Sequence, residues 1–469
     1  MFSKKYFFIF LAAYLAERLF SYFFGPETPL QSQTLVNTAM AGCYLAITAY
    51  LLLRKNIWGW GLVALELILG GAGGFLSLGP ISLRTCLLFV SMAIFDTQKA
   101  LAGEYIKKLK HNLPVTLGLT ALFVVVGLSA LHGYLTGHGL KAVFSDAVPY
   151  LFFLYYYPLR DASKHSEFKK IIFNALPAAI LGNGFFILLT ISGFSTGFFI
   201  LQDSFYHWYR DVALGKITEV GLGFYRLVLN EHLLLAPLIL YFFYRLINKK
   251  GKFRFDISLL SILFFILSFN LTRGYLLGMA IGTLFLISGT NWKRWLFYSV
   301  AAIFSFTIIF SASHLLSTRG QSFGWEIFGL RLQSVARPQI ENSALSRMLL
   351  LPKILEKIQS APLLGSGLGG TVTVYSPIFK NEITTSHFDW GYLEILVEMG
   401  IIGLMVWGVW ITIFLWQIRL RKDQTGRYLF SALTAILIIN ITSPALFHVM
   451  GVIFITGLLS YNRDFIHLT

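Results

Sequence analysis

The chain has 469 residues, of which 56% are hydrophobic and only 13% are charged, and its mean hydropathy is +0.68. Soluble domains carry about 25% charged residues, so this chain could not cover a water-exposed surface. These values exclude an ordinary soluble protein and indicate that lipid is its solvent. The formal net charge of +16 would also fit a nucleic-acid-binding protein, but its distribution along the chain argues against one.

Apolar runs of about 20 residues recur along the chain, and about 30 Å of hydrocarbon needs a helix of that length. Most runs have helical rather than alternating periodicity, which excludes an outer-membrane barrel. The first run contains Glu17 and Arg18 and has no small-residue cleavage site, so we interpret it as a retained helix and not a signal peptide. The predicted spans are 6–24, 35–53, 57–77, 81–95, 113–131, 148–159, 171–193, 229–246, 257–271, 274–289, 295–315, 393–416, 427–441 and 446–460.

The basic residues are distributed unequally between the two sides of these spans. If the N-terminus is cytoplasmic, the cytoplasmic loops contain 24 of the 38 Lys and Arg residues but only 7 of the 22 Asp and Glu residues. This is the positive-inside pattern, and it predicts cytoplasmic termini and an outer segment at 317–390. Because span 148–159 is short and Pro444 interrupts the last two spans, a twelve-pass arrangement with one re-entrant pair stays open.

The predicted fold class is therefore all-α. We expect a polytopic integral membrane helical bundle of about 12–14 transmembrane helices with one large structured periplasmic loop. The predicted divisions are an N-terminal transmembrane bundle at 1–224, central arginine-bearing spans at 225–316, the periplasmic loop at 317–390, and C-terminal transmembrane helices at 391–469.

The first recognisable part of the outer loop is an amphipathic segment at 341–360. Leu350 and Ile354 fall on one helical face, and Lys353 and Glu356 fall on the other. This spacing predicts a helix that lies on the membrane surface or on the bundle.

A glycine-rich stretch, 361–370, follows this segment and has four glycines in its last six residues. It predicts a turn that lets backbone approach backbone or a ligand closely. The next stretch, TVTVYSPIF, is too short and too β-prone to continue a helix. We therefore expect the loop to be structured and to lie at the mouth of the bundle.

Four arginines lie at or near the predicted outer ends of spans: Arg84, Arg210, Arg226 and Arg273. Charge at a membrane is costly and by default marks function. A guanidinium presents five donors in a planar fork that suits phosphate oxygens, so two or three of them on one cavity could hold a diphosphate. The alternative is that each arginine reaches lipid headgroups or pairs with an acid such as Glu231.

His387 is the candidate for proton transfer. It lies on the outer side, two residues before Asp389 and just upstream of a helix. A histidine can take a proton from a sugar hydroxyl near neutral pH, although His387 could instead only bond the backbone. His232, beside Glu231, is a weaker rival. The sequence has no G-x-x-x-x-G-K-[ST], H-E-x-x-H or D-x-D motif, so we expect neither a metal nor a cofactor.

Three stretches carry a family resemblance. The first is Tyr225-Arg226-Leu227 leading into a span, and the second is the turn Asn270-Leu271-Thr272-Arg273-Gly274. The third runs from Arg347 through the turn Pro362-Leu363-Leu364-Gly365-Ser366-Gly367 and His387 to Tyr392-Leu393-Glu394 and Glu398-Met399-Gly400. Together they resemble the O-antigen ligase and polymerase superfamily of C-type membrane glycosyltransferases. The chain departs from the usual pattern at Phe388, where asparagine is common, and at Asn230-Glu231-His232.

The resemblance implies an inverting, metal-independent polysaccharide polymerase or ligase in the bacterial plasma (inner) membrane, with its active site facing the periplasm. Arg226 and Arg273, with Arg84 and Arg210, would hold the diphosphate of an undecaprenyl-diphosphate-linked oligosaccharide donor. His387 would be the catalytic residue at the acceptor. The residues expected to support the acceptor or the loop are Arg347, Asp389, Tyr392, Gly365 and Gly367.

The expected partners are the lipid-linked donor, a glycan or lipid-linked acceptor and the bilayer, with other polysaccharide-assembly membrane proteins as candidates and no nucleic acid. Two alternatives stay open: a protein O-oligosaccharyltransferase of the same superfamily, and a flippase or transporter of lipid-linked oligosaccharides. A flippase should carry charges along a central cavity between pseudo-symmetric halves. Here the charges cluster at the outer ends of spans and the single large loop is asymmetric, which favours the enzyme.

Overall fold

The computed structural model describes residues 2–25, 34–103, 113–287, 292–337, 342–376, 381–421 and 423–461. These residues are mostly helical, with three short antiparallel hairpins. The described helices that are long and apolar enough to cross a membrane are α1 (Lys4–Phe24), α2 (Thr34–Leu53), α6 (Leu113–Leu135), α9 (Ser166–Thr196), α12 (Phe253–Asn270), α14 (Trp292–Ser317) and α17 (Gly391–Leu420). The expected all-α polytopic membrane fold is thus confirmed.

Helices that are shorter or less apolar coincide with the remaining predicted spans. They are α3 (Ile57–Leu69), α4 (Leu83–Leu101), α7 (Leu140–Leu151), η2 (Phe152–Tyr155), α8 (Tyr156–Ala162), η3 (Asn230–Leu234), α11 (Leu235–Ile247), α13 (Arg273–Phe285), α18 (Gln424–Ile439) and α19 (Val449–Tyr461). The short predicted span 148–159 is built from α7, η2 and α8 in succession, with Pro149 near the first junction. Proline removes a helical hydrogen bond and so favours such a change of helix type.

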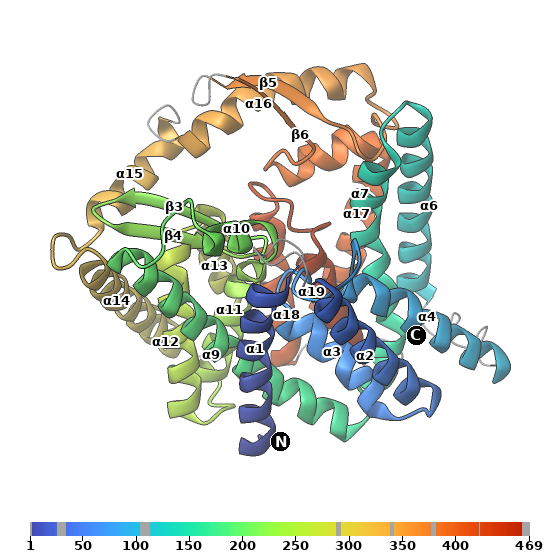
Figure 1. The fold of residues 1–469 in the computed structure, drawn as a ribbon, viewed down its shortest axis with the longest axis horizontal. Coiled ribbons are helices and arrows are strands. Elements are labelled where there is room, and N and C mark those ends of the chain that lie inside the picture. The colour runs from blue at the N-terminus through green and yellow to red at the C-terminus, as the bar shows by residue number, and fades with distance from the viewer. Residues whose placement is uncertain are drawn as a thin grey trace.

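Most of the non-spanning elements gather at the end of the bundle opposite the N-terminus (Figure 1). They are α10 (Ser204–Asp211), β3 (Lys216–Gly221), β4 (Phe224–Val228), α15 (Trp325–Ala336), α16 (Asn342–Ser360), β5 (Val372–Ser376) and β6 (Asn381–Thr385). A smaller hairpin joins β1 (Ser77–Leu78) to β2 (Ile81–Ser82). In Figure 1, α15 and α16 arch from the β3–β4 hairpin to β5, β6 and the start of α17.

The predicted amphipathic helix is α16, and the β-prone stretch after the glycines forms strand β5. Leu350 and Ile354 pack in one cluster with Val372 and Phe388. Lys353 lies on the opposite side of α16 and is exposed. The apolar face of α16 therefore packs on β5, on Phe388 and on the first part of α17.

Helix α13 is held against α18 by a stripe of small residues. Gly274, Gly278 and Gly282 recur every four residues along α13. A β-carbon added to Gly278 or Gly282 would lie 2.7 or 3.2 Å from the Ala435 or Ser431 carbonyl oxygen of α18, and one added to Gly274 would lie 2.5 Å from the Thr442 hydroxyl just after α18. In a membrane, such stripes let two helix backbones approach closely. The contact fixes α13, whose first residue is Arg273.

Helix α17 is broken at Gly400, where φ is 63° and ψ is −165°. The break frees carbonyl groups that water cannot satisfy within a bilayer. The glycine-rich turn supplies the missing donors: the Ser366 amide donates to the Val397 carbonyl at 2.7 Å, and the Gly367 amide donates to Glu398 at 3.1 Å. In the reverse direction, the Ile401 amide donates to Pro362 at 2.9 Å.

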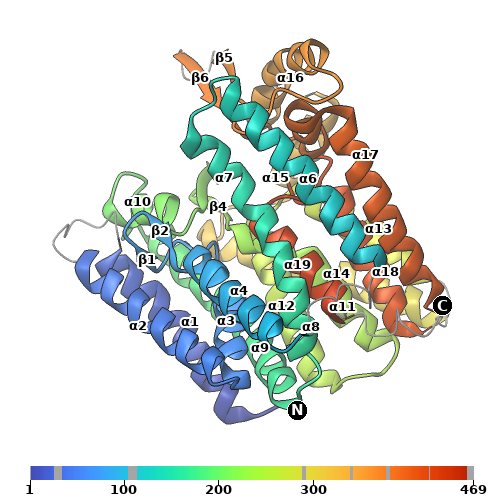
Figure 2. The same ribbon diagram turned by 90° about the vertical axis from the view of Figure 1, so that its right-hand side faces the viewer.

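Gly365 and Gly367 therefore let the backbone of the glycine-rich turn lie close to the backbones of α17 and α6. Both have positive φ, and a Cβ on Gly365 would lie 2.5 Å from the Glu398 backbone. A Cβ on Gly367 would lie 2.2 Å from the Gly133 amide of α6. Figure 2 shows α6, α7 and α17 side by side along one flank, with α16 at their upper end. The glycine turn is the joint that fastens the outer loop to this flank.

The joint generates a stability prediction. Gly400→Ala would force a β-carbon into an unfavourable left-handed conformation, 2.3 Å from the Leu363 carbonyl oxygen. Backbone strain of this kind costs about 1–3 kcal/mol before the clash is counted, so we expect a lower melting temperature in detergent. The matched control is Gly408→Ala in the same helix, where no atom lies within 4 Å of the added carbon. Equal melting of the Gly400 variant and the wild type would show that the joint contributes nothing.

Candidate active site

Arg226 lies on strand β4 and not on the helix that follows it. The β3–β4 hairpin pairs Thr218 with Arg226 and Ile217 with Leu227. Because neighbouring residues of a strand face opposite sides, the buried Ile217 and Leu227 form an apolar face and Arg226 lies on the other face. The hairpin thus presents the arginine at a defined position just before η3, where the sequence alone predicted only the entry to a span.

The Arg226 side chain contacts the predicted turn between α12 and α13. Its Nε donates to the Asn270 carbonyl oxygen at 2.7 Å, and its Nη2 donates to Thr272 Oγ1 at 3.0 Å. Within the turn, the Thr272 amide donates to Asn270 Oδ1 at 3.0 Å, and Leu271 has a left-handed φ of 47°. The turn is therefore rigidly defined by contacts to its backbone.

Arg273 begins α13 on the far side of the same turn. Its Nη1 donates to the Arg331 carbonyl oxygen at 3.3 Å and to the hydroxyl of Ser334, both on α15. Arg226 and Arg273 are thus brought to one turn by a strand, two helices and the outer loop. Both arginines thus lie at one turn, and their role as diphosphate ligands stays a prediction.

His232 supports this turn from within the bundle and is almost completely buried. Its Nδ1 lies 2.9 Å from Asn270 Nδ2 and 3.3 Å from the Leu229 amide nitrogen. Both partners are donors, so Nδ1 accepts and Nε2–H donates to Asn183 Oδ1 at 3.3 Å. The weaker catalytic candidate therefore orients Asn270 from within the protein.

The hydrogen-bonded chain continues to a buried ion pair. Asn183 Nδ2 donates to Glu231 Oε1 at 3.2 Å, and Arg18 Nη2 donates to the same oxygen at 3.1 Å. Arg18 is only 3% exposed. The acid considered as a partner for the outer arginines is thus paired with Arg18 of α1, which links the first helix to the turn through Asn183 and His232.

His387 lies on the outer loop just before α17, with its side chain 68% exposed. Its Nδ1 is 3.3 Å from Oε1 of Glu394, a residue that is 1% exposed and whose other oxygen accepts the Phe388 amide at 3.1 Å. The hydrogen bond to Glu394 raises the pKa of His387 above its ordinary value, against the opposing effect of burial, and the Asp146 carboxylate adds to the rise. A carboxylate thus orients the ring and leaves Nε2 to accept a proton.

The electrostatic environment of Lys216 links the hairpin to the outer loop. Arg347 of α16 and Asp389 form an ion pair with Nε and Oδ2 3.3 Å apart. The surrounding protein lowers the pKa of Lys216 on β3, the neighbouring Arg226 lowers it further, and Asp389 opposes the shift. The charges of Arg226 on the hairpin and of Asp389, two residues after His387, therefore both act on the Lys216 ammonium group. Lys216 was not among the residues selected from the sequence.

Two of the expected diphosphate ligands occupy other positions. Arg84 is 2% exposed, donates to the carbonyl oxygens of Gly71 and Glu66 at 2.9 Å each, and lies 3.7 Å from the Glu66 carboxylate. Arg210 on α10 makes a two-point ion pair with Asp211 at 2.5 and 2.6 Å. A guanidinium that neutralises a protein carboxylate is a poor ligand for a substrate. Arg84 and Arg210 therefore bind groups outside the turn that Arg226 and Arg273 share, and the diphosphate-binding role of the four arginines stays a prediction.

The remaining support residues have structural contacts. The Tyr392 hydroxyl donates to the Leu437 carbonyl oxygen at 2.9 Å and ties α17 to α18. Gly365 and Gly367 form the joint described above. Among the residues that the structure describes, no group of three or more His, Cys, Asp and Glu side chains is arranged to hold a metal ion.

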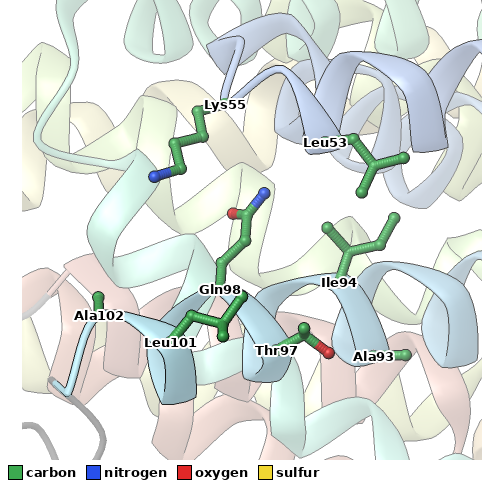
Figure 3. A pocket seen from close by; sticks show the side chains of 8 residues that line it. All are labelled: Leu53, Lys55, Ala93, Ile94, Thr97, Gln98, Leu101 and Ala102. Atoms are coloured by element: carbon green, nitrogen blue, oxygen red, sulfur yellow. The ribbon is translucent and has the colours of Figure 1, made fainter.

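A recess of about 520 Å³ lies elsewhere, between the ends of α2 and α4 (Figure 3). Its lining residues are Leu53, Lys55, Ala93, Ile94, Thr97, Gln98, Leu101 and Ala102. None of the candidate site residues contributes to it. The recess therefore has no part in the arrangement around the turn and the loop.

Comparison with known proteins gives one family match. No curated protein matches the chain. Residues 257–408 match the family model described as O-antigen ligase. This range includes Arg273 with its turn, Arg347, His387 and Glu394, whereas Arg226 precedes it. Residues 257–408 therefore contain an O-antigen ligase domain, which agrees with the superfamily that the sequence resembles.

Proposed function

We propose that this protein is a bacterial cell-surface polysaccharide polymerase or ligase that moves a glycan from undecaprenyl diphosphate to an acceptor hydroxyl on the outer face of the plasma membrane. The family match supports the ligase or polymerase class. The observation that carries the finer proposal is the convergence of Arg226 and Arg273 on one turn, with the His387–Glu394 pair on the loop above the bundle.

The arginines would act on the leaving group. When the bond between the sugar and the diphosphate breaks, negative charge develops on the phosphate oxygens. Fixed guanidinium groups stabilise this charge without the need to reorganise, as an oxyanion hole does. The Asn270 carbonyl oxygen and the Thr272 hydroxyl, both neutral groups, orient the Arg226 guanidinium.

His387 would act on the acceptor. The acceptor hydroxyl loses its proton to His387 Nε2 while its oxygen forms a bond to the anomeric carbon. The bond from this carbon to the diphosphate breaks, and its electron pair leaves with the diphosphate, so the configuration at the carbon inverts. The Glu394 carboxylate at Nδ1 would stabilise the imidazolium ion that forms.

The side of the membrane is part of the proposal. The positive-inside pattern favours a cytoplasmic N-terminus. The β3–β4 hairpin, α15, α16 and the start of α17 lie at the opposite end of the bundle (Figure 1). This supports an active site on the periplasmic face, where a lipid-linked donor presents its glycan after translocation.

The arginine clamp predicts a large loss of activity in Arg273→Ala. We expect glycan transfer from a lipid-linked donor in reconstituted membranes to fall by about 10²-fold or more, because one transition-state donor group is removed. Protein level in the membrane should stay unchanged. The control is Arg319→Ala, an exposed arginine beyond α14 that donates to the Ser195 carbonyl oxygen. Normal polymer formation by the Arg273 variant would remove the clamp from the mechanism.

The proposed base predicts a loss of about 10²–10⁴-fold in His387→Ala. A loss smaller than about tenfold would leave His387 with a structural role only. The measurement is the initial rate of glycan transfer at saturating donor. A membrane-abundance assay on the same samples separates lost chemistry from lost protein.

The Glu394 hydrogen bond predicts how activity depends on pH. His387 acts as a base only when neutral, so activity should be lost as pH falls through its raised pKa. Glu394→Gln keeps an oxygen that can accept from Nδ1 but removes the charge. The pKa of His387 should then fall, and the acid limb of the kcat/KM profile should move to lower pH. An acid limb that stays in place would exclude the His387–Glu394 pair as the titrating unit.

A further inference from the structure

We propose that Lys216 is a third cation of the donor site and binds the second phosphate of the lipid diphosphate, beside the phosphate that Arg226 would hold. This inference rests on the proposed function, and it assigns a recognition role to a residue outside the matched family range. It follows from the register of the hairpin, from the charges that surround Lys216 and from the chemistry of the ammonium group.

The hairpin register places Lys216 and Arg226 on the same face. Lys216 pairs with Val228, and Thr218 pairs with Arg226. Residues two apart on a strand share a face, so Lys216 and Arg226 are diagonal neighbours across the two strands. Long side chains at diagonal positions can reach a common ligand. The apolar residues of the opposite face, including Ile217, hold the hairpin against the bundle.

The charges around Lys216 are mostly positive. Arg226 and Arg347 both lower the pKa of its ammonium group, whereas Asp389 opposes them. Asp389 is already paired with Arg347 at 3.3 Å. Lys216 thus lies within electrostatic range of two arginines and one acid, and its side chain makes no hydrogen bond or ion pair with another residue in the described part of the chain. Like charges brought together in this way are stabilised when an anion binds between them.

The ligand chemistry follows from the proposed donor. A diphosphate carries two adjacent anionic groups, whereas a lipid monophosphate carries one. Arg226 presents a planar fork that is already oriented by Asn270 and Thr272. Lysine adds a compact point charge with three rotatable donors, which suits a second phosphate at a variable angle. Lys216 would therefore make the site selective for diphosphate over monophosphate.

The test compares two lipids and three variants. Undecaprenyl diphosphate and undecaprenyl monophosphate are titrated against the full-length protein in nanodiscs of zwitterionic lipid. Wild type should bind the diphosphate more tightly. Lys216→Gln should weaken diphosphate binding by roughly tenfold or more, the effect of a lost charge-assisted hydrogen bond, with little change for the monophosphate. Lys216→Arg should restore binding to within about threefold of wild type. Lys141→Gln, at an exposed lysine of α7, should leave both affinities unchanged.

The outcomes separate the inference from the function on which it rests. If wild type binds neither lipid, the proposed donor fails. If wild type binds the diphosphate and Lys216→Gln binds it equally well, only the Lys216 assignment fails. An equal loss for both lipids would also overturn the second-phosphate role. If Lys216→Gln binds the diphosphate normally but has a raised KM for an acidic acceptor glycan, Lys216 recognises the acceptor and the proposal is overturned.

Discussion

The hydrogen bonds from the Arg226 guanidinium to the Asn270 carbonyl and the Thr272 hydroxyl are the interaction on which the candidate site depends. A cation at the edge of a bilayer persists only where protein groups or a ligand satisfy its donors. Here those groups belong to a turn whose own geometry is unusual, with Leu271 in a left-handed conformation. The hydrogen bonds therefore hold both the Arg226 side chain and the turn in place. Arg273 follows this turn directly, so the turn also sets its position.

The bundle contributes to this turn from several directions. His232 accepts a hydrogen bond from Asn270. A series of hydrogen bonds continues from His232 through Asn183 and Glu231 to Arg18 of α1. The small-residue stripe of α13 holds the helix that begins at Arg273 against α18. Residues far apart in the sequence thus determine the orientation of one short segment. Such a network suits a reaction in which fixed dipoles and charges must face a developing anion.

The outer loop is fastened by a separate device. The break in α17 at Gly400 exposes carbonyl groups that the glycine-rich turn satisfies. From the first turn of α17, the Glu394 side chain reaches back to His387 and to the Phe388 amide. These contacts give the loop a defined geometry. The Lys216 ammonium group is affected by the charge of Arg226 on the hairpin and by the charges of Asp389 and Arg347 on the loop.

Local patterns in the sequence predicted the helical spans, the amphipathic helix α16 and the β-strand after the glycines. These features depend on residues that are near one another in the chain. The partners of the charged residues could not be predicted in the same way, because Arg18 and Glu231 are 213 positions apart and Arg84 meets Glu66 through folding. The hairpin strand Lys216–Gly221 has a short alternating pattern that a search for helical spans passes over. Glu394 belongs to the Tyr392-Leu393-Glu394 stretch, but only the structure shows that its side chain turns back to His387.

The most direct test is an experimental structure of the protein in nanodiscs with undecaprenyl diphosphate bound. We expect the two phosphates to lie within about 4 Å of the Arg226 and Arg273 guanidinium groups, the usual limit for an ion pair, with the lipid chain leaving toward the bilayer. A diphosphate bound elsewhere, with both guanidinium groups still turned to their protein partners, would contradict it.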